Sequence, residues 1–457
     1  MSLALLRSLS RKQPSVKVRK LLLFPLVAAT YFMVSGGPYG IEDILGGAGY
    51  LKALLILLIL PFFWSLPTAL MIGELASAIP AEGGFYVWVR RAMGPFWGFQ
   101  EAWLSLAACI FDMAIYPTLF VLYLGKLVPG WTVGYRGTLW ALLVVVVCCA
   151  WNLRGAYAVG NGSVALFVLL LSPFVVMAAA GLWRGMHSAG VANWHQQNGS
   201  AALSTAILVA MWNYMGWDSA STVAQEVENP QRNYPLAMLL TAALVTVTYL
   251  LPLAAVAAAG IPVERFSTGS WVDAAEFLAG PWLAIAVVVG GLINGFGMFN
   301  ALMLSYTRLP LAMAEDGMLP AWLGTENKNK APVAAILVCG VGWALALGFS
   351  FERLISIDLI LYGGSLILEF VALVVLRVRE PEMQRPFLAG NFTVACLLGV
   401  APAGLIVYAL YSAREERMAH MPALAFALLL AAGGPLGYWL ARARQRRRPE
   451  IVAPPEG

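Results

Sequence analysis

Apolar stretches of about 20 residues recur from one end of the chain to the other, and this pattern restricts the possible folds more than any other feature. Of the 457 residues, 60% are hydrophobic and only 12% are charged, and the mean hydropathy is +0.76. A helix needs about 20 apolar residues to cross a lipid bilayer. A soluble protein of this length would carry far more charge. The sequence therefore predicts an all-α membrane protein embedded in the lipid bilayer.

The first apolar stretch contains an interruption, VSGGPYGIED, from Val34 to Asp43. Two adjacent glycines and Pro38 cannot continue a regular helix. Inside a bilayer, broken backbone is tolerated only where protein buries it or where it lines a water-filled cavity.

We expect about twelve transmembrane helices, near 21–48 (broken), 51–79, 96–125, 138–157, 159–182, 203–228 (broken), 235–259, 281–312, 332–350, 354–378, 392–412 and 420–442.

A second interruption, WNYMGWDSAS, divides the sixth span between Trp212 and Ser221. Breaks in spans one and six suggest a five-plus-five inverted repeat, since interrupted helices at matching positions of two halves mark a transporter's binding site. The first repeat would cover 21–182 and the second 203–378. Two further helices would follow in 392–442, and basic tails would occupy 1–20 and 443–457.

The distribution of basic residues predicts the orientation in the membrane. Most of the 29 Lys and Arg lie in the two tails and in alternate loops, and cytoplasmic loops are the ones enriched in these residues. Both termini should then be cytoplasmic in a plasma (inner) membrane. The five cysteines show no metal-ligand spacing, and no nucleotide loop or catalytic triad occurs. We therefore expect no enzyme activity, metal, cofactor, nucleic acid or indicated partner subunit.

The two breaks supply most of the candidate binding residues. Freed N–H groups suit an anion, while freed carbonyls and acids suit an ammonium group. Asp218 is flanked by aromatic residues and is a reasonable ammonium receptor, although it could also cap the second half-helix. A structural kink is the alternative at the first break. The candidates at the breaks are Ser35, Gly36, Gly37, Pro38, Tyr39, Trp212, Asn213, Tyr214, Gly216, Trp217 and Asp218.

Further acids fall inside or beside predicted spans, where each costs about 2.5–3.5 kcal/mol on insertion scales and needs a partner or a role. Glu42 follows the first break and is expected to face the cavity, and Asp112 lies near the centre of the third span. Asp112 could bind a substrate amine, hold a proton or serve as a hydrogen-bonded structural acid. For Glu74 and Glu369, a structural hydrogen bond and a proton relay are equal alternatives. The candidates for proton coupling are Asp112, Glu74 and Asp218.

A set of motifs, in order, resembles the amino acid–polyamine–organocation superfamily over roughly residues 20–440. These motifs are VSGGPYGIED, PAEGGFYVWV, AMGPFWGFQEAW, NLRG, GWDSASTVAQEVENPQRNYP and LEFVALVVLRVREPEMQRPF. They are most similar to the polyamine-uptake branch of plants and trypanosomatids, beside the light-subunit amino acid transporters. In those amino acid transporters an Asn typically follows the Gly-Trp pair, whereas this chain has Asp218.

The resemblance implies the inverted-repeat fold with spans one and six unwound at a midplane site, alternating access and secondary transport. Proton coupling is usual in the polyamine branch. Some bacterial relatives use a lysine of the fifth span, but 159–182 contains none, so a carboxylate would have to titrate. Tyr116, Trp217 and Tyr362 would line the cavity.

These observations favour a secondary transporter that imports polyamines or related organic cations by proton symport. A diamine needs separated acids and little positive charge, and no Lys or Arg falls near the middle of the inferred site. The alternative is a permease or exchanger of neutral or cationic amino acids. That carrier would hold the α-carboxylate on the Ser35–Gly37 backbone and the amine on Asp218. A receptor that binds without transport is a further class, but it would be expected to lose these acids and glycines.

Overall fold

The computed structural model describes residues 20–187, 203–347, 351–412, 414, 417–418 and 421–446, and these residues are almost entirely helical. Residues 1–19 and 447–457 of the predicted tails lie outside this part of the chain. The helices of the first part are α2 (Leu23–Val34), α3 (Glu42–Ala48), α4 (Tyr50–Phe63), α5 (Ser65–Ala78), α6 (Phe85–Met93), α7 (Pro95–Leu127), η1 (Pro129–Trp131), α8 (Tyr135–Asn152) and α9 (Ala156–His187).

The remaining described elements follow the second predicted break and end in a short hairpin and a long helix. They are α10 (Leu203–Asn213), η3 (Asp218–Thr222), η4 (Ala224–Glu226), α11 (Pro230–Ala258), η5 (Val263–Arg265), α12 (Trp271–Ala279), α13 (Pro281–Tyr306), α14 (Arg308–Glu315), η6 (Ala321–Gly324), α15 (Val333–Leu345), α16 (Phe351–Arg379), α17 (Phe392–Leu398), α18 (Val400–Ser412), β1 (Arg417–Met418), β2 (Met421–Pro422) and α19 (Ala423–Arg446).

Among the described residues, nine helical stretches are long and apolar enough to cross a membrane, which confirms a multi-pass membrane protein. The helices α2 and α15 are apolar but shorter. The predicted span at 51–79 matches the membrane-crossing stretch Tyr50–Ala78, within which α4 and α5 meet at Trp64. Pro67 has no N–H to bond the carbonyl at the end of α4, so the helix is interrupted there.

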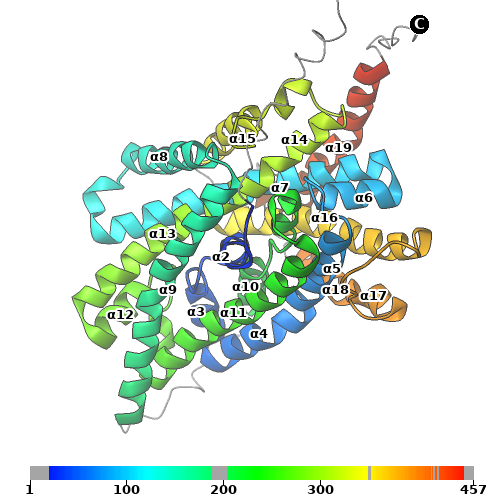
Figure 1. Cartoon of the computed structure of the whole chain (residues 1–457). Helices are drawn as coiled ribbons and strands as arrows, with labels where there is room; N and C mark the ends of the chain where they lie inside the picture. Colours follow the sequence, from blue (N-terminus) through cyan, green and yellow to red (C-terminus); the bar gives the residue numbers. More distant parts are fainter. Residues whose placement is uncertain are drawn as a thin grey trace, which may run out of the picture.

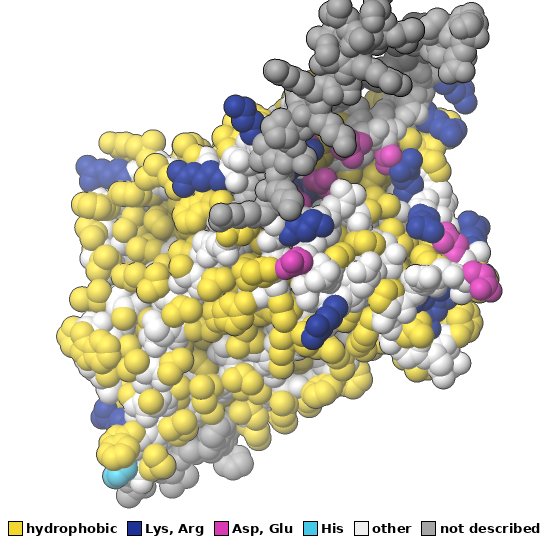
Figure 2. Space-filling view, in the orientation of Figure 1, with side chains coloured by type: hydrophobic (Ala, Val, Ile, Leu, Met, Phe, Trp, Pro, Cys, Tyr) yellow, Lys and Arg dark blue, Asp and Glu magenta, His cyan; other side chains and the backbone are white. Residues whose placement is uncertain are grey.

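The short helix α2 lies at the centre of the bundle and packs against α9, α11 and α13 (Figure 1). Outward-facing positions of the peripheral helices carry exposed apolar side chains, for example Val146, Val407 and Leu429. Figure 2 shows this apolar surface over most of the visible face, with charged side chains gathered toward the end that carries α6 and α14. An apolar belt with charges at one end is the surface expected of a protein surrounded by lipid.

Both interruptions predicted from the sequence are present. Helix α2 ends at Val34 and α3 begins at Glu42, while α10 ends at Asn213 and a 3-10 turn begins at Asp218. Gly216 has a φ of +87°, and a Cβ at this position would lie 2.4 Å from the carbonyl oxygen of Met33. The two breaks are therefore in direct backbone contact, and a glycine at 216 is what allows it.

Candidate functional site

A small closed cavity lies between the two breaks and helices α7 and α13. The space left between its side chains is about 10 Å³, room for about one water molecule. The site is therefore occluded in this conformation, and a larger ligand requires the lining to separate. The lining residues are Met33, Val34, Gly36, Tyr39, Asp112, Tyr116, Leu119, Trp212, Asn213, Met215, Gly216, Asn294, Met298, Leu302 and Tyr306.

Asp112, in the middle of α7, is the acidic residue of this lining. Its Oδ1 accepts a hydrogen bond from the Tyr116 hydroxyl at 2.6 Å and a longer one from Trp212 Nε1 at 3.4 Å. Tyr116 is four residues further along α7 and so lies on the same helix face. These donors stabilise a negative charge on Asp112 at the edge of the cavity.

Helix α13 contributes a row of lining residues that the sequence interpretation largely missed. Asn294, Met298, Leu302 and Tyr306 are spaced four residues apart, which places them on one face of a helix. The four-residue spacing of these side chains in the eighth apolar stretch could have indicated this cavity-lining face from the sequence. Both side-chain polar atoms of Asn294 are buried and have no hydrogen-bond partner. An unsatisfied buried amide facing a cavity is a group prepared for a ligand.

Asp218 lies behind the cavity lining rather than in it. Its Oδ1 accepts a hydrogen bond from the Tyr362 hydroxyl at 2.7 Å, and that hydroxyl accepts one from the backbone N–H of Gly216 at 3.2 Å. Tyr362 thus connects α16 to the broken backbone of the second interruption. Asp218 is buried, and the Tyr362 hydroxyl occupies its Oδ1 in this conformation.

Glu42 lies outside the lining of the closed cavity and is fully buried. Its two oxygens accept hydrogen bonds from the Gly40 N–H at 2.6 Å, the Tyr123 hydroxyl at 2.9 Å and the Gly269 N–H at 3.2 Å. This carboxylate therefore satisfies the Gly40 N–H, a backbone donor freed by the first break. It connects α3 to the loop before α12.

The other predicted residues at the breaks make mainly structural hydrogen bonds in this closed conformation. The Ser35 Oγ accepts from the Gly37 N–H, and the Pro38 carbonyl accepts from Trp271 Nε1. Tyr39 donates to the Val287 carbonyl at 2.6 Å, although its ring lines the cavity. Beside the second break, Tyr214 donates to the Leu57 carbonyl and Trp217 to the Tyr214 carbonyl.

Glu74, a predicted proton-coupling candidate, is bound by two arginines. Arg377 makes a bidentate contact with it, Arg385 lies 3.4 Å away, and the Ala389 N–H donates to it at 2.8 Å. Two guanidinium partners compensate the burial of this carboxylate. This geometry is that of a structural ion pair and differs from that of an acid that exchanges protons.

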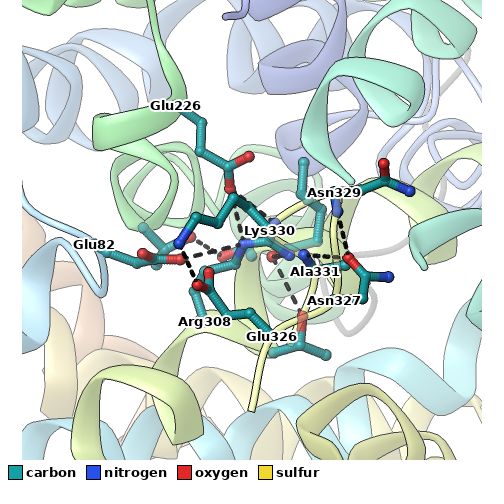
Figure 3. A network of polar contacts seen from close by, with 12 residues as sticks. Glu82, Glu226, Arg308, Glu326, Asn327, Asn329, Lys330 and Ala331 are labelled. Atoms are coloured by element: carbon teal, nitrogen blue, oxygen red, sulfur yellow. Dashed lines mark hydrogen bonds and ion pairs between the residues drawn. The ribbon is translucent and has the colours of Figure 1, made fainter. Parts of the chain in front are cut away.

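A network of polar contacts at the charged end of the molecule includes Glu82, Glu226, Arg308, Glu326 and Lys330 (Figure 3). Arg308 is fully buried and contacts Glu226 at 2.8 Å and Glu82 at 3.8 Å. Lys330 pairs with Glu326 at 2.6 Å. Arg308 therefore joins α14 to the segments after α5 and η3, whereas the Lys330–Glu326 pair lies within the loop before α15.

Backbone hydrogen bonds also connect segments at this end of the molecule. The Leu21 N–H donates to the Glu226 carbonyl at 2.8 Å, and the Glu228 N–H donates to the Leu21 carbonyl at 2.9 Å. The Gly83 N–H donates to the Thr222 carbonyl at 3.0 Å. The entry to α2 is therefore tied to the segment that follows the second broken helix.

Glu82 is expected to make the unfolding temperature of the protein depend on pH. The pKa of Glu82 is raised from its ordinary 4.5 to about 7, chiefly by burial. The attraction of Arg308 lowers this pKa, and the like charges of Glu226, Glu326 and Glu315 raise it. An acid whose pKa rises on folding contributes stability that is complete below pH 4.5 and is lost as the pH climbs through 7. Glu82→Gln should therefore unfold at a higher temperature than wild type at pH 8 and at the same temperature at pH 4.5.

Thermal unfolding of the purified protein in detergent at both pH values measures this difference. Glu382→Gln is the control, because Glu382 is exposed and its loss should leave both temperatures unchanged. An equal temperature difference between Glu82→Gln and wild type at both pH values would contradict the assignment.

The site offers nothing typical of a resident metal. Within the part of the chain that the structure describes, no three or more His, Cys, Asp or Glu residues lie grouped to hold an ion. The geometry is that of a binding cavity at two broken helices, with an acid and an unsatisfied amide facing it.

Comparison with known proteins identifies the family. The family model for amino acid permeases matches residues 27–430. The chain is 36% identical to the polyamine transporter PUT1 of Oryza sativa subsp. japonica, over 90% of this chain and 78% of that protein. It is 35% identical to a probable polyamine transporter of Arabidopsis thaliana, over 88% and 81%. It is 25% identical to the serine/threonine exchanger SteT of Bacillus subtilis, over 83% and 86%.

These matches confirm the predicted superfamily and a transporter rather than an enzyme. The chain belongs to the amino acid permease family of the amino acid–polyamine–organocation superfamily, a family of multi-pass membrane transporters.

Proposed function

We propose that this protein is a secondary transporter that imports polyamines, or related organic cations, by proton symport. The observation that carries the proposal is the charge of the cavity: its lining includes Asp112 and the unpartnered amide of Asn294, and it contains no Lys, Arg or His. An ammonium group fits such a lining, because the carboxylate pairs with its charge and the amide oxygen accepts a hydrogen bond. The names of the two plant relatives support the same substrate class.

A diamine needs a second acid, and Asp218 is the proposed partner of its second amine. Asp112 and Asp218 are near enough for their charges to influence each other. One amine would bind Asp112 between Tyr116 and Trp212, whose stacked rings lie 6.3 Å apart. The other would displace the Tyr362 hydroxyl from Asp218. Aromatic faces beside each acid add cation–π attraction.

The proposed architecture follows from the two breaks. Twelve membrane helices would form two inverted repeats of five, at 21–182 and 203–378, with two more helices in 392–442. The charged end around Arg308 would face the cytoplasm, together with both chain termini. Alternating access would then require breaking the backbone hydrogen bonds around Leu21 and Glu226.

The decisive test is uptake of labelled putrescine by proteoliposomes under an imposed proton gradient. We expect accumulation that collapses when the gradient is dissipated, because a symporter can concentrate its substrate only by using the proton gradient. Spermidine should compete and leucine should not. If arginine or leucine is carried and polyamines neither enter nor compete, the substrate assignment is wrong.

The second candidate function is amino acid exchange, which the similarity to the serine/threonine exchanger favours. In that case the backbone at Ser35 to Gly37 would hold an α-carboxylate and Asp218 the amine. Trans-stimulation by internal amino acid, without any dependence on the proton gradient, distinguishes this function from the first.

A further inference from the structure

Acids lie at two levels along the contact between α7 and α16. The helices run in opposite directions, since α7 begins just after α6 while Arg379, at the end of α16, bonds the Ala92 carbonyl of α6 at 2.8 Å. Each helix carries two buried acids eleven residues apart, a spacing of about three turns that keeps both on one face. The charges of Asp112 and Asp358 lie near enough to influence each other, and so do those of Glu101 and Glu369.

Glu101 and Glu369 form the level nearer the start of α7. This pair is separate from the substrate cavity and accepts few hydrogen bonds. Neither residue lines the cavity, and both are fully buried. Both carboxyl oxygens of Glu369 have no hydrogen-bond partner. Glu101 accepts one bond, from the Ser105 hydroxyl at 2.9 Å, and its other oxygen has no partner.

No described cation is placed to neutralise Glu369. On the elements packed against α16, the facing charges are the acids Glu101 and Asp218, and the basic residues are exposed or already paired. Those basic residues are Arg90 with Asp316, Arg91 with Glu380, Arg377 and Arg385 with Glu74, Arg379 on the Ala92 carbonyl, and the exposed Lys126, Arg442, Arg444 and Arg446.

A carboxylate that is buried without donors or a cation is too costly to keep charged. We infer that Glu369, held beside Glu101, is a proton-binding site distinct from the substrate cavity and carries the proton of the transport cycle. This inference rests on the proposed proton-coupled function. Glu369 holds the proton because Glu101 already has a donor in Ser105.

Asp218 links this proton site to the substrate. The charges of Glu369 and Asp218 lie near enough to repel each other. The pair is therefore most stable with one negative charge and one bound proton. A proton on Glu369 lets Asp218 carry that charge, which is the form that binds an amine. Proton binding at Glu369 and amine binding at Asp218 are therefore cooperative.

Glu101 offers the exit route for the proton. It lies six residues inside the start of α7, about 9 Å along the helix axis. The proposed orientation puts that end of α7 at the cytoplasm. A proton released from Glu369 thus passes to Glu101 and then to the cytoplasmic side.

Glu369→Gln tests the site, because glutamine keeps the shape of the protonated acid and cannot release a proton. In proteoliposomes, putrescine counterflow without a gradient should stay within about threefold of wild type, since the substrate cavity is unchanged. Accumulation driven by a proton gradient should fall to equilibration, and putrescine-dependent proton entry, followed with an internal pH dye, should disappear. Glu382→Gln removes an exposed acid and should behave as wild type.

Two transport results would overturn the inference. One is gradient-driven accumulation by Glu369→Gln equal to wild type. The other is loss of counterflow together with accumulation in a variant that remains monodisperse, which would make Glu369 a structural or substrate-binding residue.

An infrared measurement separates this inference from the proposed function. Wild-type protein should show a carbonyl stretching band of protonated carboxylic acid, and Glu369→Gln should lower its intensity, whatever the substrate is. If wild type fails to transport putrescine, the proposed function is wrong and the band alone decides the protonation of Glu369. An unchanged band in Glu369→Gln overturns the inference.

Discussion

Gly216→Ala is expected to prevent formation of a stable transporter. The new Cβ would lie 2.4 Å from the Met33 carbonyl oxygen, a backbone atom that cannot rotate away, at a φ of +87°. The left-handed backbone alone costs about 1–2 kcal/mol for a residue with a side chain. Separating the two broken segments adds to that cost, because it also disturbs the Gly216–Tyr362 hydrogen bond. We expect a fall of at least about 10 °C in unfolding temperature, or no monodisperse protein.

Gly280→Ala is the matched control for this variant. Gly280 has a φ of +89° and nothing within 4 Å of its hypothetical Cβ, so it suffers the same backbone strain without the clash. The two variants, compared by size-exclusion chromatography and thermal unfolding, isolate the contact between the breaks. Equal destabilisation of both would show that this contact contributes nothing.

Asp112→Asn is expected to reduce putrescine uptake by about 30-fold or more, since truncating one partner of a buried charge pair costs about 2–5 kcal/mol. The amide oxygen can still accept the hydrogen bonds of Tyr116 and Trp212, so the fold should persist. The loss should appear as a higher KM for putrescine in initial-rate uptake by proteoliposomes.

Asp273→Asn removes an exposed acid of α12 and should leave uptake unchanged. Unchanged putrescine kinetics in Asp112→Asn would exclude Asp112 as an amine receptor. A variant that loses putrescine uptake but still transports a neutral amino acid would favour the exchanger function instead.

The spans and breaks could be predicted because their causes are local. Apolar length, Pro38 and the glycines act within a few residues of their own position. The junction at Trp64 inside the predicted span at 51–79 was not predicted, because a count of apolar residues does not register Pro67. The acids Asp112 and Asp218 were also found locally, as charges inside apolar stretches.

The roles of those acids were not predictable, because they depend on partners far away in the chain. Asp112 and Trp212 are 100 residues apart, Asp218 and Tyr362 are 144 apart, and Glu74 and Arg377 are 303 apart. Sequence alone left Glu74 and Glu369 with the same two alternatives. Packing separates them, since two arginines bind Glu74 and no donor reaches Glu369.

The sequence by itself determined that this chain is a multi-pass membrane protein of the amino acid permease family, with two broken helices and acids beside them. Those properties follow from composition, turn-forming residues and motifs read in order. Only the tertiary structure decided the surroundings of each acid. Asp112 faces the cavity, and Glu42 accepts a hydrogen bond from freed backbone. Arginines pair with Glu74, and Glu369 is left without a hydrogen-bond partner. The reason is physical: the state of a buried charge depends on the donors and cations within a few ångströms, and the fold brings these together from distant segments.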